Sequence, residues 1–162
     1  MKIKSPTLLV DQDKVLKNIR QMKQKAKESG AELRPHFKTH HSADIGEWFR
    51  SEGINRITCS SVSMAKYFAK HGWKDITIAF PYNPLESEDI DALAGIIQLN
   101  IIIESLESLV HVIHNIDNRV NIFLKIDIGT HRTGLLPENI DLIDRLINYD
   151  SKHHMLIGLI GH

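Results

Sequence analysis

The chain has 162 residues, of which 42% are hydrophobic, and its 20 Lys and Arg residues balance its 20 Asp and Glu residues. This length and composition fit one domain with an apolar core, and the zero formal charge gives no reason to expect binding to nucleic acid or to an anionic membrane. Cys59 is the only cysteine, which excludes an intrachain disulfide and a zinc cluster built on cysteines. The first residues contain no apolar leader core, and no apolar run is long enough to span a bilayer. We therefore expect a soluble, cytoplasmic protein.

Strands and helices alternate along the sequence. Short apolar or β-branched runs predict strands over residues 7–10, 32–35, 56–59, 75–80, 99–103, 120–126 and 155–160. Between them, apolar residues recur at helical spacing over residues 15–26, 45–49, 64–68, 86–94, 106–116 and 138–149. Asp11 or Asp13 is expected to cap the first helix, and Ser42 the second. The run over residues 99–103 is almost wholly apolar, which is typical of a strand buried on both faces.

This alternation predicts an α/β fold with parallel strands and right-handed crossovers. The sequence has neither a Gly-x-Gly-x-x-Gly motif after the first strand nor a P-loop, which disfavours a nucleotide-binding doubly wound sheet. Polar residues instead follow the carboxyl ends of predicted strands, among them Lys38, Asn83, Glu104 and His162. In a (β/α)8 TIM-type barrel this is the face that carries the chemistry, so we predict a barrel of that type.

The predicted barrel is incomplete. After the strand over residues 7–10 the sequence contains about six βα units, fewer than the eight of a closed barrel. Such a barrel would leave two apolar edges unpaired. Residues 1–162 are therefore interpreted as a single partial barrel domain at the amino-terminal end of a larger protein. The alternatives are a smaller open sheet and a chain that completes itself by oligomerising.

The first candidate for chemistry is the segment of residues 34–41, RPHFKTHH. A lysine amine is normally protonated, but desolvation and neighbouring positive charge lower its pKa and allow it to form a Schiff base. Arg34 and the histidines around Lys38 could supply that positive charge. From this segment alone, a basic and solvated strand-to-helix loop is an equally good reading.

The second candidate is the loop after the strand over residues 120–126. Gly129 and Gly134 permit tight turns and close backbone approach. Asp127 is expected to hold this loop by accepting backbone N–H groups. Arg132 could pair with Asp127, present its guanidinium to an oxyanion, or remain a solvated charge.

Together these segments resemble one family of enzymes. The lysine segment resembles the pyridoxal phosphate lysine segment of D-threonine aldolases and eukaryotic-type D-serine dehydratases. The run KIDIGTHRTG over residues 125–134 resembles the loop of those enzymes and of alanine racemases. The runs SPTLLVD over residues 5–11 and GLIGH over residues 158–162 resemble the family's opening strand and a later strand-end motif. The chain is thus similar to the alanine racemase-like amino-terminal barrel of fold-type III pyridoxal phosphate enzymes.

The resemblance implies roles for individual residues. Lys38 would hold pyridoxal 5'-phosphate as a Schiff base, Arg132 would hydrogen-bond the cofactor's phenolic oxygen, and His162 would lie against its pyridine ring. His40 matches a position typical of the aldolase and dehydratase branch, with an acid/base or a positioning role. Lys125 matches a supporting position near the arginine. Residues 7–10 would belong with a carboxy-terminal β domain, which is absent here together with the last barrel strands.

The function implied by the resemblance is a lyase that acts on D-3-hydroxyamino acids, of the D-threonine aldolase or D-serine dehydratase type. The complete protein would be a homodimer and would use a divalent metal. The groups that grip the cofactor's phosphate and the metal ligands would lie outside this chain, so no residue is assigned to metal and the chain alone is expected to be nearly inactive. An amino-acid racemase of the same fold and a non-catalytic cofactor-binding homeostasis protein are the alternatives.

Overall fold

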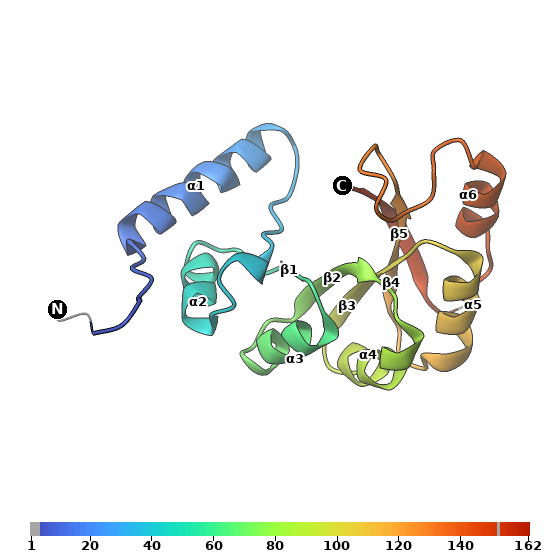
Figure 1. The fold of residues 1–162 in the computed structure, drawn as a ribbon, viewed down its shortest axis with the longest axis horizontal. Helices are drawn as coiled ribbons and strands as arrows, with labels where there is room; N and C mark the ends of the chain where they lie inside the picture. The colour runs from blue at the N-terminus through green and yellow to red at the C-terminus, as the bar shows by residue number, and fades with distance from the viewer. Residues whose placement is uncertain (1–3, 152) are drawn as a thin grey trace.

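The computed structural model describes residues 4–151 and 153–162, and its centre is a parallel sheet (Figure 1). Each strand pairs with the next one along the chain, in the order β1-β2-β3-β4-β5. The strands are β1 Ile57–Cys59, β2 Asp75–Pro81, β3 Gln98–Ile103, β4 Asn121–Ile126 and β5 Met155–Gly161. This order has no reversal point, unlike a doubly wound sheet. It is the order expected for the wall of a barrel.

The helices follow the predicted alternation. They are α1 Gln12–Glu28, α2 Ala43–Ser51, α3 Val62–Lys70, α4 Ser87–Ala94, α5 Leu106–Asn115 and α6 Ile140–Ile147, with short 3-10 turns η1 Phe37–Thr39 and η2 Pro84–Glu86. Helices α3, α4 and α5 run along one side of the strands (Figure 1). In the part of the chain that the structure describes, no helix is both long enough and apolar enough to cross a membrane.

Side-chain caps explain where several helices begin. The Asp11 carboxylate accepts a hydrogen bond from the Lys14 N–H at 3.1 Å, so Asp11 rather than Asp13 caps α1. The Ser42 hydroxyl accepts from the Ile45 N–H at 3.2 Å, which confirms the predicted cap of α2. Such caps satisfy backbone donors that have no partner inside the helix.

The two faces of the sheet differ in chemistry. The face under the helices is apolar, with Ile101 and Ile122 exposing 2% and 1% of their surface. The opposite face carries buried polar side chains, including Thr77 and Asn100, which are register partners on β2 and β3. Strand β3 is buried on both faces from Leu99 to Ile103, as predicted. If the sheet closed into a barrel, this polar face would line the interior, and it is called the inner face below.

Two predicted strands do not form. Residues 7–10 have no strand partner in the described chain, and Leu8 and Leu9 expose 87% and 63% of their surface. Residues 32–35 are irregular, and only an isolated bridge between His36 and Thr58 follows them. Pro35 has no N–H to donate to a ladder, although its carbonyl accepts from the Thr58 N–H at 2.8 Å. The sheet therefore has five strands, whereas the sequence predicted six after the strand over residues 7–10.

Phe37 anchors the lysine segment in the core, and replacing its ring tests how much this packing stabilises the fold. Its ring is 0% exposed and lies 4.9 to 5.1 Å, between centroids, from the rings of Phe49, Phe68 and Trp73. We expect Phe37→Ala to lower the free energy of unfolding by about 3–5 kcal/mol, measured by urea denaturation, because a buried aromatic ring leaves a cavity. The matched control is Phe80→Ala, since Phe80 is 60% exposed. Equal losses in the two variants would contradict this account.

Candidate active site at the carboxyl ends of the strands

Lys38 lies in the turn η1, just beyond the point where its segment meets β1. The bridge between His36 and Thr58 is parallel, so the residues after His36 continue toward the carboxyl end of β1. Phe37 points into the core while Lys38 is exposed. The Lys38 N–H donates to Nδ1 of His36 at 3.3 Å, which fixes the start of the turn. The amine of Lys38 is therefore presented at the strand ends and remains accessible.

The structure brings Lys38 and His162 close to the same imidazole. Burial lowers the pKa of His36, and the nearby charges of Lys38 and His162 lower it further. His162 directly follows β5, whereas Lys38 precedes β1, so charges from the two edges of the sheet both act on this ring. A neutral His36 adds no positive charge near the Lys38 amine at neutral pH. The sequence indicated His36 as a basic neighbour of Lys38, and its spacing two residues before the lysine is the signal for a closer relation.

His40 is packed among aromatic rings. Its ring stacks on Phe49 at a centroid distance of 5.9 Å and lies 4.5 Å from Phe37. Nδ1 accepts from the Ser42 N–H at 3.1 Å, so the neutral ring carries its proton on Nε2. Nε2 is buried and has no hydrogen-bond partner among the described residues. Burial lowers the pKa of His40, which favours the neutral form.

The loop after β4 is closed by its own hydrogen bonds. The Asp127 carboxylate accepts from the N–H groups of Gly129 and His131 at 2.9 and 3.0 Å, which confirms the predicted role of Asp127. The Asp127 N–H donates to the Leu135 carbonyl, and the Leu135 N–H donates to the Lys125 carbonyl. The loop thus leaves β4 and returns to it.

Arg132 is held out from this closed loop. Its side chain is exposed, and it has no ion pair or hydrogen bond with any described residue. Asp127, the partner considered for it from the sequence, instead lies 3.3 Å from Nδ1 of His131. Lys125 is 8% exposed and packs beneath the loop near Gly134. The guanidinium of Arg132 is therefore free to bind an oxyanion.

Glu104 is a further residue at these strand ends. It follows β3, and its Oε2 atom is buried without a hydrogen-bond partner in the described chain. A buried carboxylate oxygen without a donor is costly, so this atom is suited to receive one from a bound group. The sequence located Glu104 at a strand end but gave no reason to single it out.

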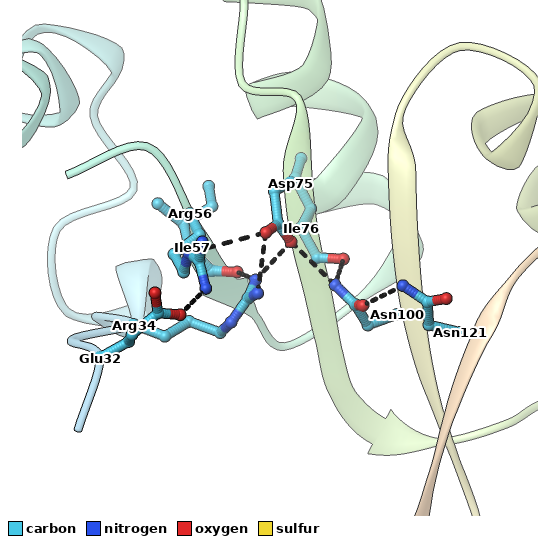
Figure 2. A network of polar contacts seen from close by, with 8 residues as sticks. All are labelled: Glu32, Arg34, Arg56, Ile57, Asp75, Ile76, Asn100 and Asn121. Atoms are coloured by element: carbon cyan, nitrogen blue, oxygen red, sulfur yellow. Dashed lines mark hydrogen bonds and ion pairs between the residues drawn. The ribbon is translucent and has the colours of Figure 1, made fainter. Parts of the chain in front are cut away.

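Arg34 does not act on Lys38 as the sequence suggested. Its guanidinium binds both oxygens of Asp75, the first residue of β2, at 2.7 and 3.0 Å (Figure 2). The paired carboxylate offsets its positive charge. The expectation that Arg34 adds positive charge beside Lys38 is therefore wrong.

The chain is similar to known proteins over almost its whole length. Residues 10–162 match the family model described as alanine racemase, N-terminal domain. A D-serine dehydratase of Dictyostelium discoideum is 29% identical, over 99% of this chain and 45% of that protein. A 3-hydroxy-D-aspartate aldolase of Paracoccus denitrificans is 30% identical, over 82% of this chain and 36% of that protein. The chain thus spans less than half the length of these relatives.

Solved structures confirm the fold. The D-threo-3-hydroxyaspartate dehydratase from Delftia sp. HT23 superposes with a TM-score of 0.88 at 26% identity, over 99% of this chain and 44% of that chain. A mutant of a D-threo-3-hydroxyaspartate dehydratase in the metal-free form gives the same TM-score of 0.88. These matches confirm the prediction of a partial TIM-type barrel.

Two glycines of the loop after β4 provide a test of how closely that loop packs against its own strand. Gly134 has φ +113°, and a Cβ there would lie 2.8 Å from the Asp127 nitrogen. Gly129 has φ +118°, but a Cβ there would meet nothing within 4 Å. Both alanine variants carry backbone strain of about 1–3 kcal/mol, so we expect Gly134→Ala to be the more destabilising in urea denaturation. Equal destabilisation would show that the close approach at Gly134 has no energetic consequence.

Because hydrogen bonds lower the pKa of Asp127, we expect the stability of the fold to depend on pH. The N–H groups of Gly129 and His131 hold its pKa below the ordinary value of 3.8. The carboxylate therefore stabilises the fold fully above that value, and the contribution is lost as pH falls through the lowered pKa. We expect Asp127→Asn to be less stable than the unsubstituted protein at pH 6 and the difference to shrink below pH 3.8. Thermal melts over this range measure it, and a difference that is constant with pH would contradict the assignment.

Proposed function

Because the chain belongs to the alanine racemase N-terminal domain family, we propose that it forms the cofactor-holding part of a pyridoxal phosphate-dependent lyase acting on D-3-hydroxyamino acids. The names of the relatives support this substrate class. D-serine, 3-hydroxy-D-aspartate and D-threo-3-hydroxyaspartate all carry a hydroxyl group on the carbon next to Cα. The chain spans less than half of these relatives, so the activity proposed is that of the protein containing it.

The observation that carries the proposal is the position of Lys38. It is an exposed amine at the carboxyl end of the sheet, beside His36, whose imidazole also feels the charge of His162. In barrels this is the face that carries catalytic groups. An accessible primary amine is also the group that an aldehyde-bearing cofactor requires.

The residues present fit pyridoxal phosphate. Lys38 would take its aldehyde, Arg132 would donate to its phenolic oxygen, and His162 would lie against its ring. The buried and unpartnered Oε2 of Glu104 is a further acceptor at the same strand ends. When bound, the cofactor withdraws the electrons left at Cα after a bond to that carbon breaks.

Residues of this chain would then orient the cofactor and move a proton at Cα. The Lys38 amine, once released, would take or return a proton at Cα. The free guanidinium of Arg132 would orient the cofactor by donating to its oxyanion. Lys125, buried below the loop, would support that arginine from β4.

For His40, the geometry supports positioning more than acid/base chemistry. Its Nδ1 is occupied by the Ser42 N–H, and Nε2 lies among aromatic rings. A proton acceptor must reach the reacting atoms directly or through one water. We propose that His40 fixes the turn after Lys38 by bonding Ser42 at the start of α2.

We further propose that the complete protein is a homodimer and uses a divalent metal. The description of a related dehydratase structure as metal-free supports the metal. Among the described residues, no group of three His, Cys, Asp or Glu side chains is arranged to hold an ion. We propose that the metal ligands lie in another part of the complete protein.

A racemase of the same fold is the second candidate, because the matching family model is described by alanine racemase. Product analysis separates the two. A dehydratase releases ammonia and a keto acid, an aldolase releases glycine and an aldehyde, and a racemase releases the opposite enantiomer. The relatives named above favour the lyases.

The direct test is covalent capture on Lys38. We expect the longest expressed form of the protein containing this chain to absorb visible light with pyridoxal phosphate, and borohydride to fix the cofactor on Lys38, as read by peptide mass spectrometry. Lys38→Ala should lose the label and lower turnover at least about 10²-fold, whereas Lys70→Ala, an exposed lysine of α3, should keep both. A label on another lysine, or none, would end this proposal.

A further inference from the structure

A chain of side-chain contacts crosses the sheet near the amino ends of its strands (Figure 2). Arg34 binds Asp75 with both arms of its guanidinium and also donates to the Ile57 carbonyl at 3.3 Å. Asp75 accepts from Nδ2 of Asn100 at 3.0 Å, and Oδ1 of Asn100 accepts from Nδ2 of Asn121 at 3.0 Å. The contacts therefore link the lysine segment to β2, β3 and β4 in turn.

These contacts lie on the polar inner face, away from the strand ends that carry the candidate site. Asp75 and Asn121 are the first residues of β2 and β4. Asn100 is 1% exposed and is the register partner of Asn121. The side chains of Arg34 and Asp75 expose only 22% and 17% of their surface. None of these groups is placed to touch a ligand at the Lys38 end.

The lysine segment needs such a link because its backbone is poorly attached. Residues 31–35 form no strand, and Pro35 cannot donate a backbone hydrogen bond. The backbone attachment to β1 is the bond from the Thr58 N–H to the Pro35 carbonyl, together with the bridge at His36. The side chains of Arg34 and Phe37, on either side of that bond, add to this attachment, as does the ion pair of Glu32 with Arg56 just before them.

We propose that Arg34 is a positioning residue for Lys38, which it acts on by clamping residues 34–38 to Asp75. Asn100 and Asn121 extend the clamp to β4, whose other end leads into the Asp127 loop and Arg132. The network thereby sets the lysine and the arginine at a fixed separation across the sheet. This inference rests on the proposed function of Lys38.

The fork geometry of arginine is what the clamp requires. A guanidinium makes two parallel bonds to one carboxylate, which an ammonium group cannot do. Arg34→Lys therefore keeps the charge and removes the clamp. The matched control is Arg20→Lys, because Arg20 also binds both oxygens of a carboxylate, Glu52, at 3.0 Å but joins α1 to the end of α2.

The experiment uses the longest expressed form of the protein containing this chain. Hydrogen exchange of the amides of residues 38–41 is measured without cofactor, with the amides of α5 as the internal reference for global opening. The rate at which pyridoxal phosphate becomes fixed on Lys38 is measured separately, with borohydride and mass spectrometry. We expect Arg34→Lys to raise exchange in residues 38–41 and to slow fixation, each about tenfold, from the loss of a charged hydrogen bond. Arg20→Lys should stay within about twofold on both measurements.

The outcomes separate this inference from the proposed function. Exchange that rises equally in α5 and in residues 38–41 would show general destabilisation and overturn the positioning role. Normal fixation and exchange in Arg34→Lys would overturn it as well, while leaving Lys38 as the cofactor lysine. Absence of fixation on Lys38 in the unsubstituted protein would overturn the proposed function and the inference together. If Arg34→Lys does not fold, Asn121→Ala removes only the last donor of the network, and an unchanged fixation rate there would overturn the inference.

Discussion

The burial of Phe37 is the interaction on which the candidate site depends. The segment that carries Lys38 has almost no backbone ladder of its own, so its position is set by a side chain rather than by a strand. A fully buried ring at residue 37, in contact with Phe49, Phe68 and Trp73, fixes the turn η1. The next residue is then directed outward, and the lysine amine is exposed as a consequence of the neighbouring ring being buried.

The loop after β4 also lies outside the strand ladder, and hydrogen bonds rather than a buried ring hold it in place. Here the chain returns to its own strand, and the carboxylate of Asp127 gathers the N–H groups of the turn. Gly134 lets the returning backbone pass against Asp127 at a distance that a side chain would not allow. Arg132 lies in the loop that these hydrogen bonds close, and it has no partner among the described residues.

The sequence was most informative where the signals are local. The caps at Asp11 and Ser42 and the role of Asp127 depend on contacts within a few residues, and the structure confirms them. The strands over residues 7–10 and 32–35 were wrong because a strand needs a partner, and extended apolar sequence does not specify one. The pairing of Arg34 with Asp75 joins residues far apart in the chain. No spacing rule predicts such a contact, so the charge of Arg34 was assigned to the wrong neighbour.

The distribution of charge follows from these contacts. The chain is formally neutral, but its charges are not paired equally at the two ends of the sheet. At the amino ends of the strands, Asp75 offsets the charge of Arg34. At the carboxyl ends, backbone N–H groups and His131 occupy Asp127, and Lys38 and Arg132 have no ion pair in the described chain. A formally neutral chain can therefore present two cations without ion pairs at one end of its sheet, and this suits an anionic ligand. The buried Oε2 of Glu104, which has no donor among the described residues, adds an acceptor at the same strand ends.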